Sequence, residues 1–376
     1  MKVLYVIMHL KKGGAELMLA RLANEIAKDE SILINIVSLT KIEQGDILFS
    51  NNVKVHALDF NKFSPTSWFK TFNKLIKIMR EFKPDIVHTW MYLSDFIGGI
   101  VAKFLGIKNI IWSIRNTKIS HSNLSINFLI LKLNSVLSYY IPNRIVSVSD
   151  IGSFYHKEIG YCKHKFKTIH NGYELSSFIP EKSSKTKLRH FYGLDSSDFV
   201  VLTIARYDHL KDHDTLLKVA MKLKLEHSNI KFVLVGRNIL NKELKYKISE
   251  LDLNDIFSLH DFTNNTFDFY NLSDIYLSTS KFEGFPNVVC EAMLMELVPV
   301  ATNAGESNLI IGDSGFVTDV GDVDSLANSI SKLYHMEKNL RQNLSIKAKN
   351  RIISEFGLDK IINEYKQLYK ELDNDK

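Results

Sequence analysis

The sequence predicts an α/β fold made of two doubly wound, Rossmann-like domains that face a cleft. Short β-branched runs alternate with longer amphipathic segments, and this alternation pauses once and then restarts. The chain has 376 residues, which is too long for one ordinary domain of roughly 100–200 residues. Hydrophobic residues make up 45% and charged residues 24%, as expected for a globular protein with a large core.

The first domain is predicted over residues 1–172. Its strands are expected at Lys2–Met8, Leu33–Leu39, Val53–Leu58, Ile86–Thr89, Ile110–Ile114, Ile145–Val148 and Thr168–His170. Its helices are expected at Ala15–Lys28, Ser67–Phe82, Leu93–Leu105, Leu124–Tyr140 and Ile151–Ile159. Strands that alternate with helices in this way form a parallel sheet.

The second domain is predicted over residues 181–356, after a polar stretch, Pro180–Lys187, whose composition is typical of a linker. Its strands are expected at Phe199–Ala205, Lys231–Val235, Ile256–Leu259, Ile275–Ser278 and Val298–Ala301. Its helices are expected at Thr215–Glu226, Lys242–Leu251, Asn264–Leu272 and Asn287–Glu296. Open parallel sheets bind ligands at the carboxyl ends of their strands, so the predicted active site is the cleft between the two sheets.

Two features of the sequence indicate a cytoplasmic protein. The N-terminal apolar stretch is short and predicts a first strand instead of a signal peptide, and the most apolar segment, Leu124–Ile141, is interrupted by polar residues. No transmembrane segment is therefore predicted. Cys162 and Cys290 are far apart and outside any zinc-binding spacing, which fits a reducing compartment without a disulfide framework.

The net charge differs between the two halves of the chain. Residues 1–172 carry 23 Lys and Arg against 12 Asp and Glu, a net charge of +11, whereas the remainder carries −5. The first half is therefore expected to face a phospholipid surface, a phosphorylated acceptor or nucleic acid, and the lack of a nucleic-acid recognition motif argues against the last. The basic amphipathic helix Ser67–Phe82 is either a membrane-surface contact or a core-facing stripe.

The most specific motif pairs two acids, Glu283 and Glu291, with seven residues between them, where a strand turns into a helix. Gly284 lets a ligand approach the backbone, Pro286 suits a first helical turn, and the helix start can bind phosphate. Asn287 and Glu291 lie one turn apart, so both can face a hydroxylated ligand. Taken alone, the pair fits equally well a helix with one dipole-stabilising acid and one exposed acid.

A second group of polar residues follows the first strand of the second domain. Arg206 and Lys211 could neutralise a diphosphate leaving group. Asp208, His209, Asp212 and His213 resemble metal ligands, but surface loops collect such residues without metals, and Asp214 is predicted to cap the helix that begins at Thr215. No metal site is therefore predicted.

Two weaker signals lie in the first domain. Gly13 and Gly14, in the segment Lys12–Glu16, could present backbone amides to a phosphate, although a tight strand-to-helix turn explains them equally well. His88 stands near the end of a strand and could face the cleft. A lone histidine at such a place is more often packed and hydrogen-bonded.

In order and spacing, these pieces resemble the family-4 retaining glycosyltransferases, which have the two-Rossmann-domain glycosyltransferase B fold. The resemblance covers nearly the whole chain and includes Gly13–Glu16, Pro84–His88, Val146–Ser149, Ile169–Gly172, Arg206 with Lys211, and the two spaced glutamates. It also implies that the helical C-terminal segment, residues 357–376, packs back on the first domain, so that deleting it should uncouple the domains. One departure is that many relatives have a second histidine where this chain has Trp90, which puts a catalytic role for His88 in doubt.

The resemblance implies a role for each matching residue. Arg206 and Lys211 would hold the donor diphosphate, Glu291 would bind the nucleotide ribose, and Glu283 would lie beside the transferred sugar. Backbone groups would contact sugar and phosphate, the nucleobase would lie near Asp261 and Phe262, and Gly13 and Gly14 would close on the donor from the other domain. The segment that supplies these backbone contacts consists of Gly284, Phe285, Pro286, Asn287 and Val288.

The implied function is transfer of a hexosyl or N-acetylhexosaminyl group from a UDP- or GDP-linked donor to an acceptor hydroxyl, with retention of configuration and without a catalytic metal or other cofactor. The acceptor would be a lipid-linked or growing glycan in the assembly of a bacterial surface polysaccharide such as lipopolysaccharide or capsule, at the inner face of the plasma membrane. Two alternatives are a nucleotide-sugar epimerase and a non-catalytic partner subunit of similar fold. The paired glutamates argue against the first, and Arg206 with Lys211 against the second.

Overall fold

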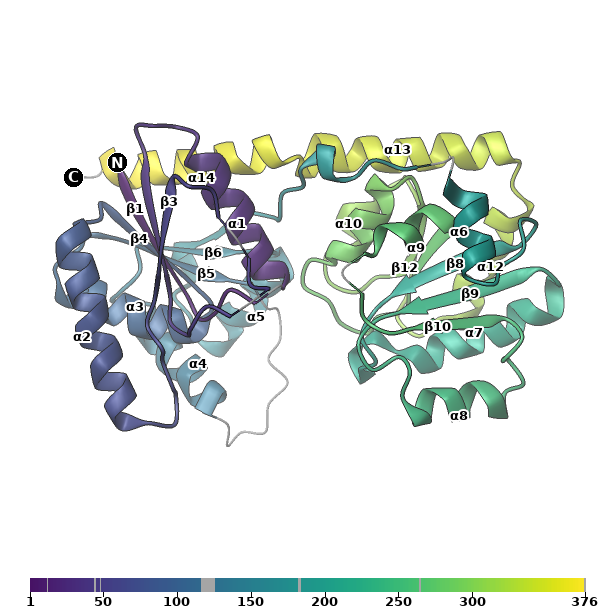
Figure 1. Ribbon diagram of the computed structural model, residues 1–376, viewed down its shortest axis with the longest axis horizontal. Helices are drawn as coiled ribbons and strands as arrows, with labels where there is room; N and C mark the ends of the chain where they lie inside the picture. The colour runs from purple at the N-terminus through teal and green to yellow at the C-terminus, as the bar shows by residue number, and fades with distance from the viewer. Residues whose placement is uncertain are drawn as a thin grey trace. The chain divides into compact units, whose positions relative to one another are not determined.

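The computed structural model describes residues 1–11, 13–43, 45–47, 49–115, 126–181, 184–263 and 265–374. The chain forms two compact units (Figure 1), unit 1 with Met1–Gly172 and Leu358–Lys376, and unit 2 with Tyr173–Gly357. Each unit is built around one parallel sheet. The predicted fold class, two doubly wound α/β domains, is therefore confirmed.

Within the described part of unit 1, seven strands pair in the order β3-β2-β1-β4-β5-β6-β7, and all neighbours are parallel. The strands are β1 (Lys2–Ile7), β2 (Leu33–Ser38), β3 (Val53–Ala57), β4 (Ile86–Trp90), β5 (Asn109–Ile114), β6 (Arg144–Ser147) and β7 (Phe166–Thr168). The last strand thus lies earlier in the chain than the expected Thr168–His170. The central strands are buried almost throughout because both faces of the sheet are covered.

The helices of unit 1 are α1 (Gly14–Ile26), α2 (Pro65–Phe82), α3 (Tyr92–Phe104), α4 (Ile126–Leu137), α5 (Asp150–Ile159) and α14 (Leu358–Asn374), with a short 3-10 helix η1 (Lys163–Lys165). One apolar cluster joins the sheet to α1 and α14, and another joins its other face to α2, α3 and α4. Leu124 and Ser125, included in the predicted fourth helix, lie outside the described residues.

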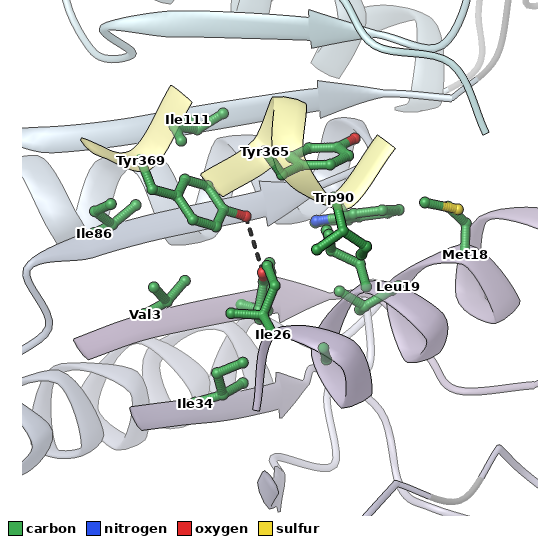
Figure 2. Packing of buried hydrophobic residues seen from close by; sticks show 14 of the residues in the cluster. Val3, Met18, Leu19, Ile26, Ile34, Ile86, Trp90, Ile111, Tyr365 and Tyr369 are labelled. Atoms are coloured by element: carbon green, nitrogen blue, oxygen red, sulfur yellow. Dashed lines mark hydrogen bonds between the residues drawn. The ribbon is translucent and has the colours of Figure 1, made fainter. Parts of the chain in front are cut away.

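Helix α14 supplies much of the core on its face of the sheet. Ile361, Tyr365, Leu368 and Tyr369 are at most 1% exposed and pack with residues of β1, β4 and α1. Figure 2 shows Tyr365 and Tyr369 on this helix beside Ile111, Ile86 and Trp90 of the sheet. Unit 1 is therefore completed by the C-terminal end of the chain.

Within the described part of unit 2, six strands pair in the order β10-β9-β8-β11-β12-β13, again all parallel. The strands are β8 (Phe199–Ile204), β9 (Ile230–Val235), β10 (Phe257–His260), β11 (Ile275–Ser278), β12 (Val298–Thr302) and β13 (Phe316–Thr318). The helices are α6 (Lys185–Phe191), α7 (His213–Glu226), α8 (Lys242–Glu250), α9 (Phe267–Leu272), α10 (Asn287–Leu294), α11 (Ser307–Ile311), α12 (Val323–His335) and α13 (Lys338–Phe356), with 3-10 turns η2 (Leu175–Ser177) and η4 (His209–Lys211).

The predicted linker, Pro180–Lys187, belongs to unit 2 and not to the boundary, which falls between Gly172 and Tyr173. Glu181 N donates to Asn271, and the ammonium of Lys185 donates to the Asp274 carboxylate at 2.8 Å. These partners lie far away in sequence, so the polar composition of the stretch did not reveal them. Lys182 and Ser183 lie outside the described residues.

Neither unit has a candidate membrane span in its described residues. No helix there is both long enough and apolar enough to cross a bilayer.

Candidate active site

Unit 2 has its candidate site where the chain changes direction across the sheet. From β8 the chain continues outward through β9 and β10, and it then returns to β11 on the other side of β8. Open parallel sheets bind ligands at the carboxyl ends of the strands at such a switch point. Arg206 follows β8 and Glu283 follows β11. The topology thus brings these two predicted residues to the same end of the sheet.

Lys211 and Glu283 form an ion pair at this end of the sheet. Nζ of Lys211 lies 2.5 Å from Oε1 of Glu283, and the hydroxyl of Ser280 donates to the same oxygen at 2.7 Å. The Lys211 side chain is 20% exposed and that of Glu283 is 13% exposed. Both charges are thus held in place within a partly desolvated site, where electrostatic interactions are stronger than in water.

Arg206 is more exposed to solvent than Lys211, the other predicted cation. Its side chain is 60% exposed, and its Nε donates to Oδ2 of Asp208 at 3.1 Å. Burial raises the pKa of the Asp208 carboxyl, but the backbone N–H of Leu210 and the Arg206 guanidinium together lower this pKa by more. The pKa of Asp208 is therefore below its usual value. Asp208 therefore stays ionised and holds the guanidinium near the loop that carries Lys211.

The loop between β11 and α10 is fixed by backbone contacts. Lys281 N donates to the carbonyl of Leu210 at 2.8 Å, and Glu306 N donates to the carbonyl of Gly284 at 3.0 Å. Gly305 has a φ of +60°, and a Cβ there would lie 2.5 Å from the carbonyl oxygens of Glu283 and Gly284. A side chain at position 305 would therefore displace the loop that carries Glu283. This glycine was not predicted from the sequence because its role depends on a long-range contact.

Helix α10 places Asn287 and Glu291 one turn apart, as predicted, although it begins after Pro286 and ends at Leu294. Tyr270 donates its hydroxyl to Oε2 of Glu291 at 3.0 Å, and Tyr173 donates to Oδ1 of Asn287 at 2.7 Å. Burial first, and the Glu291 charge second, raise the pKa of Tyr270 well above its usual value, so its phenol keeps its proton. These tyrosines, absent from the sequence prediction, orient the polar face of α10.

Asp261 and Phe262 follow β10 and are exposed. The guanidinium of Arg237 lies 4.8 Å from the centre of the Phe262 ring, and Arg237 follows the neighbouring strand β9. The aromatic ring and the guanidinium thus form a cation–π pair at the carboxyl end of the sheet. Arg237 was missed in the sequence because a single arginine after a strand has no distinctive spacing.

Asp208 and Asp212, two of the side chains that resembled metal ligands, have other partners. Asp212 caps α7 by accepting from Thr215 and also pairs with Lys281 at 3.1 Å. His213 is buried in the first turn of α7, where burial lowers its pKa to about 4. The helix cap is thus Asp212 and not the predicted Asp214, because α7 begins two residues earlier than expected. Among the described residues, no group of three His, Cys, Asp or Glu side chains could hold a metal ion.

In unit 1, Gly13 and Gly14 lie at the corresponding turn between β1 and α1. Gly13 is the residue before the helix and has an extended backbone, so its conformation does not itself require glycine. Glu16 in the first turn lies 3.4 Å from Nδ1 of His9, and burial raises its pKa. Lys12, the first residue of the predicted segment, lies outside the described residues.

His88 lies inside the core of unit 1 instead of at an open site. It has no exposed surface, its Nδ1 is 2.8 Å from the hydroxyl of Tyr369, and its Nε2 is 2.7 Å from that of Ser113. Burial first, and the charge of Arg115 second, hold its pKa well below the usual value. A neutral ring with both nitrogens bonded and no surface cannot contact a substrate in this conformation. The packed, hydrogen-bonded alternative for His88 fits these contacts.

Two family models match separate parts of the chain. The model of the glycosyl transferases group 1 matches residues 184–351, and the model described as glycosyl transferase 4-like matches residues 2–148. Together the two matches account for most of both units.

Several curated relatives align with nearly the whole chain. The capsular polysaccharide biosynthesis glycosyltransferase CapH of Staphylococcus aureus is 25% identical over 98% of this chain and 98% of its own. The GalNAc-alpha-(1->4)-GalNAc-alpha-(1->3)-diNAcBac-PP-undecaprenol alpha-1,4-N-acetyl-D-galactosaminyltransferase of Campylobacter jejuni is 27% identical over 100% of this chain and 99% of its own. The UDP-Gal:alpha-D-GlcNAc-diphosphoundecaprenol alpha-1,3-galactosyltransferase of Escherichia coli is 23% identical over 80% of this chain and 79% of its own.

Solved structures show the same fold. Anabaena HepE in complex with UDP has a TM-score of 0.82 at 20% identity, with 99% of this chain and 100% of that chain covered. A glycosyltransferase from Rickettsia africae also has a TM-score of 0.82 at 20% identity, with 99% and 98% covered. The family matches, the relatives and the two parallel sheets agree: the chain belongs to the group 1 glycosyltransferases and has the glycosyltransferase B fold.

Proposed function

We propose that this glycosyltransferase moves a hexosyl or N-acetylhexosaminyl group from a UDP- or GDP-linked donor to an acceptor hydroxyl with retention of anomeric configuration. The observation that carries the proposal is the Lys211–Glu283 ion pair, which lies with Arg206 at the carboxyl end of the β8 and β11 strands. A nucleoside diphosphate needs cations for its phosphates, and a sugar needs hydrogen-bonding side chains for its hydroxyls. Both kinds of group are present on this short part of unit 2.

Lys211 and Arg206 would bind the diphosphate, and the backbone of Gly284–Val288 at the start of α10 would add amide donors. Amides in the first turn of a helix have no partner inside the helix and favour phosphate. Glu291, oriented by Tyr270, would accept from the ribose hydroxyls. The base would lie near Asp261, where Phe262 and Arg237 provide a ring and a planar cation.

The reaction forms a bond between the acceptor oxygen and the anomeric carbon and breaks the bond from that carbon to the phosphate oxygen. The acceptor attacks on the face that the diphosphate leaves, and a phosphate oxygen takes the acceptor proton, so the products are glycoside and nucleoside diphosphate. Glu283 would stabilise positive charge that develops on the sugar, while Lys211 and Arg206 stabilise the negative charge on the leaving group. With these fixed cations, the proposed reaction needs no metal.

The proposed acceptor is a lipid-linked or growing glycan of the bacterial surface. This follows the names of the E. coli and C. jejuni relatives, which specify diphosphoundecaprenol and PP-undecaprenol, and of the S. aureus relative, which specifies capsular polysaccharide. Such an acceptor would bring the protein to the cytoplasmic face of the membrane as a peripheral enzyme. The net charge of +11 over residues 1–172, from 23 Lys and Arg and 12 Asp and Glu, would favour that surface.

The proposal is tested by measuring nucleotide release from UDP- and GDP-linked hexoses and N-acetylhexosamines, with and without undecaprenyl-diphosphate sugars. We expect acceptor-dependent release from one donor class, unchanged by EDTA, and a product whose anomeric configuration by NMR equals that of the donor. Interconversion of donor sugars without acceptor would instead identify an epimerase. No turnover and no thermal stabilisation by any nucleotide would identify a non-catalytic subunit.

A further inference from the structure

Helix α4 of unit 1 has its apolar residues on the outside. Five of them share one face at spacings of three and four residues, continuing one turn past the helix end: Ile126, Leu129, Leu133, Val136 and Tyr140. Leu129 is 58% exposed, Val136 60% and Tyr140 71%. Single exposed leucines are common on proteins, but a continuous apolar stripe on one helix indicates a binding surface.

The inner face of the same helix contains polar residues. Asn134 donates to the carbonyl of Tyr92 at 2.7 Å, Ser135 donates to that of Lys132 at 2.8 Å, and Ser138 just beyond the helix accepts from Cys162 N at 2.8 Å. All three side chains are at most 5% exposed. A surface helix normally places its polar residues toward water and its apolar residues toward the core, so α4 is reversed in part.

The surroundings of the stripe carry positive charge. Between Asp95 and Asp150 the sequence has no Asp or Glu, whereas it has four lysines and two arginines. At the C-terminal end of α4, the ammonium of Lys165 donates to the carbonyls of Ser138 and Tyr139. Burial lowers the pKa of Lys165, the nearby Cys162 partly offsets this, and the charges of Lys103 and Arg144 lower the pKa further, so Lys103 and Arg144 lie near Lys165 at this end.

Helix α2, the membrane contact considered from the sequence, differs from α4. Its apolar residues Leu75 and Met79 are fully enclosed, and Trp68, Phe72 and Ile76 pack against the same core cluster. Phe69, 71% exposed, is the one large apolar side chain that the described part of α2 leaves in the open. The stripe on α2 therefore faces the core, as the alternative interpretation of that helix held.

We propose that the exposed face of α4 binds the surface of an anionic phospholipid bilayer. The stripe would enter the boundary between headgroups and acyl chains, Tyr139 and Tyr140 would lie at headgroup depth, and Lys103, Lys132, Arg144 and Lys165 would meet lipid phosphates. A second copy of the chain fits this face less well, because its cations would face like charges. The inference deepens the proposed function, on which it rests for the lipid-linked acceptor.

The test is co-sedimentation of the full chain with vesicles of phosphatidylcholine alone or of phosphatidylcholine mixed with phosphatidylglycerol. We expect binding to the anionic vesicles that weakens as salt is added. Leu129→Ser combined with Val136→Ser should lower the vesicle-bound fraction at least about tenfold, because two apolar side chains no longer leave water. Lys103→Glu combined with Lys132→Glu should also lower it. Matched controls are Leu225→Ser on α7, where Leu225 is 87% exposed, and Phe69→Ser on α2.

Several outcomes would overturn the inference. These are no binding of the unaltered chain to anionic vesicles, unchanged binding of the α4 double variant, or loss of binding in Phe69→Ser alone. A dimer in light scattering that the α4 variant converts to monomer would assign the face to a second copy. Stabilisation by UDP or GDP, measured on every variant, tests the proposed function separately, since it should persist when vesicle binding is lost.

Discussion

The two units share one architecture but place opposite chemistry beside their central strands. In unit 2, the carboxyl ends of β8 and β11 lead to Arg206, Lys211 and Glu283, which are charged and partly open to solvent. In unit 1, the central strands β1 and β4 carry Tyr5 and His88, which are fully buried beneath the tyrosines of α14. The difference teaches that α14 buries polar side chains within the central strands of unit 1, whereas the polar residues that follow the central strands of unit 2 stay partly open to solvent.

The largest effect is expected from removing the fixed cation of unit 2. Lys211→Met leaves Glu283 without its cationic partner, so a carboxylate would repel the donor diphosphate in place of an attracting ammonium. Nucleotide release in the transfer assay should fall by about 10²–10³-fold. Lys218→Met, at an exposed position of α7, is the matched control and should leave release unchanged. If Lys211→Met releases nucleotide as fast as the unaltered chain, the charged residues of unit 2 are not the reactive counterpart of the buried residues in unit 1.

The second-largest effect is expected on the free energy of unfolding of unit 1, which should fall at acid pH. Burial lowers the pKa of His156 to about 4, so its ring is neutral in the folded state and gains a proton on unfolding. Stability is therefore lost as pH falls below the unfolded pKa of about 6.5, by about 2 kcal/mol between pH 7 and pH 5. His88 should add to this loss, since its pKa is lowered as well.

Tryptophan fluorescence can measure this effect in unit 1 alone, because all three tryptophans, Trp68, Trp90 and Trp112, belong to it. Urea unfolding followed at pH 7 and pH 5 gives the two free energies. His156→Gln, which cannot titrate, should remove about 2 kcal/mol of the difference between them. The same pH dependence in that variant as in the unaltered chain would contradict the assignment.

A smaller effect is expected from the hydroxyl that joins α14 to the sheet. The hydroxyls of Tyr369 and Tyr5 lie 2.9 Å apart, and His88 bonds to the same Tyr369 oxygen. Tyr369→Phe should lower the free energy of unfolding of unit 1 by about 1–2 kcal/mol, since buried polar partners lose a bond. Tyr139→Phe, at a side chain that is 53% exposed, should change it little. Equal stability of the two variants in urea would show that the Tyr369 hydroxyl does not help to hold α14 on the sheet.

The smallest effect concerns Tyr270, which orients Glu291 in unit 2. Tyr270→Phe keeps the ring but removes the hydrogen bond to the carboxylate. We expect KM for the donor to rise by up to about tenfold with kcat nearly unchanged, because one hydrogen bond contributes about 1 kcal/mol. A fall in kcat at constant KM would mean that Tyr270 acts on the transition state and not on donor binding.

The sequence predicted most of the fold because local patterns carry it. The strands Val53–Ala57 and Ile275–Ser278 and the helix Lys242–Glu250 lie within a residue of their expected bounds, since β-branched runs and helical periodicity are short-range signals. Strand β13 has three residues, too few for an alternation to be recognised. Helix α13 is long, but it has only a weakly apolar side, so its helical periodicity was not recognised.

The burial and the hydrogen-bond partners of the site residues could not be predicted from the sequence, because distant residues determine them. His88 is buried by Tyr369, 281 residues further along the chain, and no spacing rule connects the two. The partners of Lys211 and Glu291, namely Glu283 and Tyr270, also follow from loop and helix placement. The chemical types of the site residues were predictable, whereas their burial and their hydrogen-bond partners were not.

The discontinuous composition of unit 1 has a consequence for synthesis of the chain. Helix α14 is synthesised after all of unit 2, and until then β1 and β4 lack the α14 side chains that pack beside α1 on one side of the sheet. At about 5–20 residues per second, the roughly 200 residues after Gly172 delay completion of unit 1 by about 10–40 s. Unit 2 is continuous and can fold during that interval, so the N-terminal half of this protein is expected to finish folding after the part made later, with nascent chains exposed to chaperones meanwhile.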